Sequence, residues 1–257
     1  MTQRELYDFF EAALPAALAC PWDHDGVQVM TEGGRPVRRV LATLDVSERV
    51  VDYAVENGID LIVSHHPLLF RPLYALTSDT PVGRILAKLT ANGIALFSFH
   101  TRADKAEGGV SDLLARRLGL TDVEPLETEE GPLARVGTLP AYVKLADYAA
   151  SVKESLACDG VLLAAADPNR SIRRIAVSGG EGGDFVEDAR RAGADLFISG
   201  RIGYHRMLDA CEGGMALLEA GHYFTEREVI YYFAALIKQA DPDIEIVTYA
   251  PKSLALV

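Results

Sequence analysis

Residues 38–64 read RRVLATLDVSERVVDYAVENGIDLIVS, and residues 173–199 repeat this pattern without a gap as RRIAVSGGEGGDFVEDARRAGADLFIS. In each stretch two short apolar runs flank a segment with helical periodicity, which predicts a strand, a helix and a second strand. The two stretches are identical at several positions, among them Gly58/Gly193, Asp60/Asp195 and Ser64/Ser199. The pattern indicates a duplicated unit. The alternative is that two strand–helix–strand units look alike only because the fold requires similar sequences.

The rest of the chain continues this alternation of short apolar runs and amphipathic stretches. Further strands are predicted at 94–99, 161–163, 215–219 and 244–249. Helices are predicted after capping signals at Thr2, Ser47, Ser111 and Thr225, and also over 83–92 and 145–156. Strands that alternate with helices favour an α/β fold with largely parallel strand pairing.

An acidic segment with three prolines, residues 121–140, is the predicted connection between the two copies. We therefore expect two related α/β lobes, residues 1–125 and 126–257, packed closely together. One large sheet is the alternative. In either arrangement, a site at the junction of the halves would be built from matching loops.

The composition narrows the class of protein. Of the 257 residues, 49% are hydrophobic and 24% charged, which is typical of a folded globular chain. The 25 basic and 37 acidic side chains give a net charge of −12, which disfavours nucleic acid and anionic lipid as partners. The sequence shows no signal-peptide pattern and no apolar run of about 18 residues, so we expect a cytoplasmic protein without a membrane partner.

Four histidines follow the predicted strands at the points where these end. His65 and His66 come directly after the strand at 61–64, His100 follows the next strand, and His222 follows the strand at 215–219. Ligands of open α/β sheets collect beyond the carboxyl ends of the strands. These histidines are therefore candidates for one shared site.

A carboxylate lies four residues after a histidine in both halves, as Asp104 after His100 and Glu226 after His222. Imidazole and carboxylate together suit zinc, iron or manganese. With the pair His65 and His66, this set exceeds what one tetrahedral ion needs and favours two divalent ions.

Each element of this set also has an ordinary explanation. Adjacent histidines at a strand end can be an accident, and His100 alone can be a hydrogen-bonded loop residue. Glu226 can serve a helix N-terminus, because it follows the predicted cap at Thr225. It is the joint placement that favours metal binding.

Three further features stay open. His24 and His205 can orient a ligand or a substrate, or can be structural or surface histidines. The glycine run at 179–183 suggests a phosphate-binding loop or a tight turn. Because it lacks the Lys-Ser/Thr of a P-loop and the GxGxxG spacing, a turn is the favoured interpretation.

The motifs together resemble one known family. They are Trp22-Asp-His-Asp-Gly-Val-Gln28, Ser64-His-His-Pro67, His100-Thr-Arg-Ala-Asp104 with Gly108-Gly109, and Gly221-His-Tyr-Phe-Thr-Glu226. The chain resembles, over nearly its full length, the GTP cyclohydrolase I type 2 homologues, also called the NGG-interacting-factor-like dinuclear metal proteins. The resemblance implies two related α/β lobes with a dimetal centre between them, and a homohexamer. Some members carry an inserted middle domain, for which this chain is too short.

The resemblance also implies roles for single residues. His65 and His222 would bind one ion, His66 and Asp104 the other, and Glu226 would bridge both ions. His100 would stand nearby as a proton-transfer or supporting group.

The chain departs from the family pattern beside these ligands. Arg102 stands where an Asn is common, Arg201 where an Asp is common, and His24 replaces an Asn. With Arg71, the arginines put a cation beside three motif loops, which predicts an anionic, phosphorylated small molecule as substrate. Ordinary surface arginines are the alternative.

Two functional hypotheses follow. The first is a metal-dependent hydrolase of GTP cyclohydrolase type, which cleaves a C–N bond of a nucleotide-like small molecule with His100 and Glu226 as catalytic residues. The second is a non-enzymatic metal-binding scaffold or regulatory interaction protein.

Overall fold

The computed structural model describes residues 1–255, which form two compact α/β units. The first unit combines residues 1–106 with 229–251, and the second contains residues 107–228 and 252–255. This division differs from the expected lobes 1–125 and 126–257. The chain returns to the first unit because its last strand pairs there with a strand from the first copy of the repeat.

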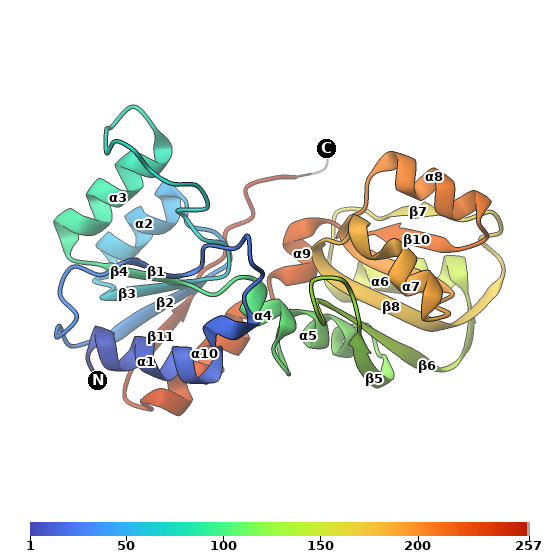
Figure 1. Ribbon diagram of the computed structural model, residues 1–257, viewed down its shortest axis with the longest axis horizontal. Helices are drawn as coiled ribbons and strands as arrows, with labels where there is room; N and C mark the ends of the chain where they lie inside the picture. Colours follow the sequence, from blue (N-terminus) through green and yellow to red (C-terminus); the bar gives the residue numbers. More distant parts are fainter. Residues whose placement is uncertain (256–257) are drawn as a thin grey trace. The chain divides into compact units, whose positions relative to one another are not determined.

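The first unit is built on a five-stranded sheet (Figure 1). Its strands are β1 (Gly26–Val29), β2 (Arg39–Thr43), β3 (Leu61–Ser64), β4 (Ala95–Ser98) and β11 (Glu245–Thr248), in the order β1-β4-β3-β2-β11. Only β1 runs antiparallel to its neighbour. The helices are α1 (Gln3–Ala13), the 3-10 turn η1 (Ala16–Leu18), α2 (Glu48–Glu56), α3 (Pro81–Asn92), α4 (Thr101–Lys105) and α10 (Val229–Ala240).

Helices cover both faces of this sheet. Helices α2 and α3 pack on one face, and α1 and α10 lie on the other (Figure 1). On the side of α1 and α10, the rings of Phe10 and Phe99 stack with centroids 4.7 Å apart, and Phe233 packs against both rings. The inner strands β2, β3 and β4 are therefore buried on both faces, which explains their apolar runs.

Local signals in the sequence explain where these helices begin and end. Thr2 and Glu5 form the predicted capping box of α1, and Ser47 caps α2. Helix α3 begins at Pro81 behind the cap Thr80 and ends at Gly93, whose φ of 65° is the left-handed conformation that glycine adopts without strain.

The second unit contains a six-stranded mixed sheet in the order β5-β6-β8-β9-β10-β7. Its strands are β5 (Thr121–Leu126), β6 (Ala134–Lys144), β7 (Leu162–Ala164), β8 (Ser171–Glu181), β9 (Leu196–Arg201) and β10 (Ala216–Glu219). The neighbours β8, β9 and β10 are parallel, and the other pairs are antiparallel. The helices are α5 (Val110–Arg117), α6 (Leu145–Leu156), the 3-10 turn η2 (Gly183–Phe185), α7 (Val186–Arg191), α8 (Tyr204–Glu212) and α9 (His222–Glu226).

Two sequence predictions for residues 107–144 of this unit are wrong. The segment 121–140 is not a connection but forms β5 and much of β6, which pair as antiparallel neighbours. Ser111 does not cap α5, which has Gly109 at its N-cap. Instead the buried Ser111 hydroxyl donates to the carbonyl oxygen of Leu133.

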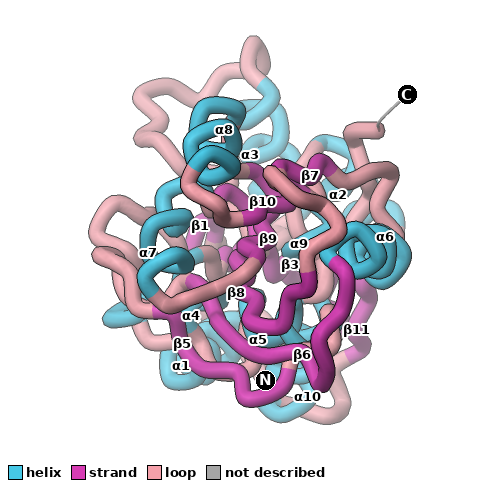
Figure 2. The backbone as a smooth tube through the Cα atoms, turned by 90° about the vertical axis from the view of Figure 1, so that its right-hand side faces the viewer, coloured by secondary structure: helices cyan, strands magenta, loops and turns pink. Residues whose placement is uncertain are grey.

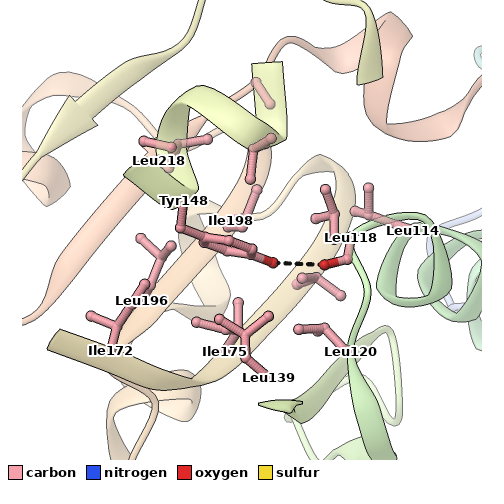
Figure 3. Packing of buried hydrophobic residues seen from close by; sticks show 14 of the residues in the cluster. Leu114, Leu118, Leu120, Leu139, Tyr148, Ile172, Ile175, Leu196, Ile198 and Leu218 are labelled. Carbon is pink, nitrogen blue, oxygen red and sulfur yellow. Dashed lines mark hydrogen bonds between the residues drawn. The ribbon is translucent and has the colours of Figure 1, made fainter. Parts of the chain in front are cut away.

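Alternating side chains of the second sheet form two apolar layers. Ile175 and Val177 of β8 face the cluster with α5 and α6, whereas Ala176 between them faces α7 and α8. Figure 2 shows α7 and α8 on one side of the central strands and α6 on the other. In the first layer Tyr148 is buried, and its hydroxyl donates to the carbonyl oxygen of Leu118 at 3.0 Å (Figure 3). Burial raises the pKa of Tyr148.

The two copies of the repeat fold alike. The backbone amides of Arg38 and Arg39 both donate to the Asp60 carboxylate, at 2.8 and 3.0 Å. In the second unit the backbone amides of Arg173 and Arg174 donate to the Asp195 carboxylate at 2.8 and 2.9 Å. Asp60 and Asp195 are therefore equivalent, because each connects the start of the first strand to the start of the second strand through two hydrogen bonds.

Within residues 1–255, none of the helices combines the length and apolar character that a membrane crossing requires.

Candidate metal centre

Three predicted histidines come together in the first unit. His65 and His66 follow β3, and His100 follows β4, which pairs in parallel with β3 through Ser64 and Ser98. The ring centroids of His65 and His66 are 4.9 Å apart, and those of His65 and His100 are 5.1 Å apart. One ring nitrogen of each histidine lies within 4.8 Å of one from each of the others.

Each of these rings is oriented through its Nδ1 atom. Nδ1 of His65 lies 3.1 Å from the carbonyl oxygen of Phe99, which can only accept, so this nitrogen carries the proton. Nδ1 of His66 lies 2.7 Å from a carboxylate oxygen of Asp45. Nδ1 of His100 lies next to a carboxylate oxygen of Asp23. Coordination through Nε2, with Nδ1 held by an acceptor, is the usual arrangement of metal-binding histidines.

Asp104 adds a carboxylate to this cluster. It lies on the short helix α4, and its Oδ1 is 3.6 Å from Nε2 of the fully buried His65. The donor set of the first unit is therefore imidazole with carboxylate, and it could hold a divalent metal ion.

A carboxylate that the sequence analysis missed anchors His100. Oδ1 of Asp23 lies 3.1 Å from Nδ1 of His100, and its Oδ2 accepts from the amide and the hydroxyl of Thr101. Burial opposes the charge on Asp23, but these hydrogen bonds and the charge of His100 outweigh it and hold the Asp23 pKa well below its ordinary value. Burial also opposes protonation of His100, yet Asp23 and Asp104 raise the His100 pKa above its ordinary value.

The motif around Trp22 therefore contacts His100 through its two aspartates and not through its histidine. His24, considered as a ligand-orienting residue, is exposed. Its neighbours Asp23 and Asp25 point inward, where Asp25 accepts from the backbone amide of His100 at 3.1 Å. The available sequence signal was this family motif itself, in which both aspartates flank the histidine.

Arg102 is not a substrate-facing cation, which corrects one part of the expected cationic surround. Its guanidinium is buried and donates to Asp25 and to Glu11, both at 2.8 Å. It also lies over the ring of Phe99. Two carboxylates thus neutralise Arg102, whereas Arg71 and Arg201 are exposed.

In the second unit His222 and Glu226 occupy the first and last positions of α9. Nε2 of His222 lies 2.9 Å from Oε2 of Glu226, whose side chain is 5% exposed. Thr225 does not begin the following helix as predicted. It lies inside α9, where its hydroxyl donates to the carbonyl oxygen of His222.

The glycine run at 179–183 makes room for Glu226. It forms neither a phosphate loop nor an isolated turn, since β8 continues to Glu181. A Cβ placed on Gly180, whose φ is +57°, would lie 2.1 Å from Oε1 of Glu226. A Cβ on Gly179 would lie 3.0 Å from Cγ of the same glutamate. Only glycine permits this close approach of the strand to the carboxylate.

His205, the remaining histidine of the chain, lies exposed on α8 against the ring of Tyr204.

Comparisons with known proteins identify one family. The family model described as Duf34/NIF3 (NGG1p interacting factor 3) matches residues 1–253. A GTP cyclohydrolase 1 type 2 homolog from Clostridium perfringens is 34% identical, covering 96% of this chain and 95% of its own length. One from Streptomyces coelicolor is 38% identical, covering 86% and 80%. The crystal structure of a Staphylococcus aureus hypothetical protein, 25% identical, covers 100% of this chain and 99% of its own with a TM-score of 0.89. The chain therefore belongs to the Duf34/NIF3 family.

Proposed function

We propose that this protein is a metal-dependent hydrolase that cleaves a C–N bond of a nucleotide-like small molecule. The observation that carries the proposal is the cluster of His65, His66 and His100, in which an acceptor holds every Nδ1. Such anchoring is typical of metal-binding histidines. Relatives that bear the name GTP cyclohydrolase 1 type 2 homolog support the reaction class.

Two divalent ions per chain, of zinc, iron or manganese, complete the proposed site. The proposed ligands are His65, His66, Asp104, His222 and Glu226. Bound ions of this kind lower the pKa of water and stabilise developing negative charge. The donor sets support this assignment, because each unit supplies imidazole next to a carboxylate.

His100 and Glu226 have the proposed catalytic roles. Asp23 holds Nδ1 of His100 and stabilises its charged form, so proton exchange with the substrate would occur at Nε2. Glu226 would be a shared ligand of the ions in this proposal, and its side chain lies close to the backbone at Gly179 and Gly180.

The location, assembly, substrate and partners that we propose rest on the family and on the net charge of the chain. We expect a cytoplasmic homohexamer that acts on a small phosphorylated substrate and has no nucleic acid or membrane partner. The exposed Arg71 and Arg201 support an anionic substrate, whereas Arg102 does not.

The test is incubation of the metal-loaded protein with GTP, followed by detection of formate and of a pterin precursor. We expect both products with the wild type and neither with His65→Ala or Glu226→Ala. His205→Ala, an exposed histidine on α8, is the matched control and should retain full turnover. A fully loaded wild type that releases neither product would contradict the proposal.

The complete burial of His65 favours one second candidate, a metal-binding scaffold. An ion held there would link the ends of β3 and β4 and stabilise the fold. This function predicts that chelation lowers the melting temperature by several degrees while no substrate is turned over. Unchanged melting after metal removal would contradict it.

A further inference from the structure

Two large aromatic side chains lie exposed beside the histidine cluster. The indole of Trp22 is 44% exposed, and the ring of Phe70 is 46% exposed. Their centroids are 6.1 Å apart in an edge-to-face arrangement. Each also lies next to the ring of His100, at 6.1 Å for Trp22 and 6.3 Å for Phe70. Exposed aromatic rings at the edge of a polar site are a common feature of ligand-binding surfaces.

The two rings come from different segments that one side chain fixes to each other. Gln28, on β1, accepts through its Oε1 from the backbone amide of Leu69 at 2.8 Å. Its Nε2 donates to the carbonyl oxygen of His24 at 3.0 Å. Since Leu69 precedes Phe70 and His24 follows Trp22 closely, this amide holds both aromatic segments in position. A surface held in this way loses little entropy when a ligand binds.

We propose that Trp22 and Phe70 form the binding surface for the planar nitrogen heterocycle of the substrate. This inference rests on the proposed function, because it places the ring beside His100, the group assigned to proton transfer. Aromatic side chains bind bases by stacking, which tolerates different ring substituents and requires no ionised partner.

Gln28 is the positioning residue of this surface. It need not touch the ligand, since both of its hydrogen bonds go to backbone atoms of the two aromatic segments. Its loss would therefore weaken ring binding without changing the metal ligands. Tyr74 lies on the same loop as Phe70 but is 96% exposed, which makes it a matched control.

The molecule carries its own probe, because Trp22 is its only tryptophan. Intrinsic fluorescence of the metal-loaded protein is measured during titration with guanosine, and with ribose 5-phosphate as a probe that lacks the ring. We expect guanosine to quench the emission and ribose 5-phosphate to leave it unchanged. Phe70→Ala should raise the Kd for guanosine about tenfold, Gln28→Ala should raise it severalfold, and Tyr74→Ala should not change it.

Metal content and melting temperature, measured on every variant, separate ring binding from misfolding. Phe70→Leu, which keeps apolar bulk, covers the case in which Phe70→Ala does not fold, and it should also weaken guanosine binding. Equal responses to guanosine and ribose 5-phosphate, or unchanged affinity in folded Phe70 variants, would overturn the inference even if GTP is hydrolysed. Guanosine binding that depends on Phe70 without turnover of GTP would support the inference and contradict only the hydrolase.

Discussion

Asp23 and His100 form a buried carboxylate–imidazole pair, with Oδ1 of Asp23 3.1 Å from Nδ1 of His100 and the Asp23 side chain fully inaccessible. The two residues are separated by 77 positions in the sequence. The pair fixes the ring of His100 and favours its protonated form, because the aspartate stays ionised. This relationship connects the motif around Trp22 to the end of β4.

Replacing Asp23 by Asn should lower kcat about 10- to 100-fold, because His100 loses the charge that orients and stabilises it. Metal content should stay at the wild-type value, since Asp23 is not a proposed ligand. The measurement is steady-state kinetics with elemental analysis of the same sample. His24→Ala, at the exposed neighbouring position, serves as control and should behave like the wild type. Equal kcat in both variants would show that the pair has only a structural role.

Replacing Asp45 by Asn should weaken metal binding about tenfold, since Nδ1 of His66 loses its charged acceptor. Competition with a chromogenic chelator measures the affinity. Asp52→Asn removes a surface carboxylate of α2 that pairs with Lys88 and should leave the affinity unchanged. If both variants bind metal like the wild type, the contact between Asp45 and His66 does not support metal binding.

Replacing Arg102 by Leu should destabilise the protein by about 3–5 kcal/mol, because Asp25 would remain as a buried charge without its partner. Urea denaturation measures the free energy of unfolding. Arg84→Ala breaks an ion pair with Glu48 at the surface and should cost at most about 1 kcal/mol. A stable Arg102 variant that has lost substrate affinity would instead identify this arginine as a substrate contact.

Replacing Gly180 by Ala should abolish most activity, because the new Cβ would displace the carboxylate of Glu226. The variant also carries the strain of a left-handed alanine, about 1 kcal/mol. Gly193→Ala carries the same strain, with a φ of +73°, but its Cβ would meet nothing within 4 Å. Turnover measured on both variants separates the two effects. Loss of activity in Gly193→Ala to the same extent would attribute the defect to strain alone.

Local patterns in the sequence predicted much of the fold. The capping box at Thr2, the cap at Ser47 and the apolar runs of β3 and β4 involve neighbours in the chain, so periodicity and caps were sufficient. The return of β11 to the first unit depends on a long-range contact, which the local pattern does not contain. β5 was missed for another reason, because it is exposed along most of its length and lacks the apolar run that marks a strand. Thr225 has a local cap signal and was predicted to begin the following helix. It lies instead inside α9, the helix that carries Glu226.

The sequence predicted that the histidines of the candidate site come together, but it did not predict the carboxylates that support them. The role of these histidines as metal ligands stays a prediction. His65, His66 and His100 could be found because strand ends of a parallel sheet converge. Asp23 and Asp45 could not be paired with their histidines, because 77 and 21 residues separate them and no periodicity relates such positions. Arg102 was misinterpreted for the same reason, since its partners Asp25 and Glu11 lie far away in the sequence.

Metal content per protomer tests the central claim most directly. Elemental analysis of the purified wild type, read against protein concentration, should give two equivalents of a divalent transition metal. His65→Ala and His66→Ala should each contain less, and His205→Ala should match the wild type. A wild type that carries fewer than one equivalent after loading, or histidine variants with undiminished metal, would contradict the account.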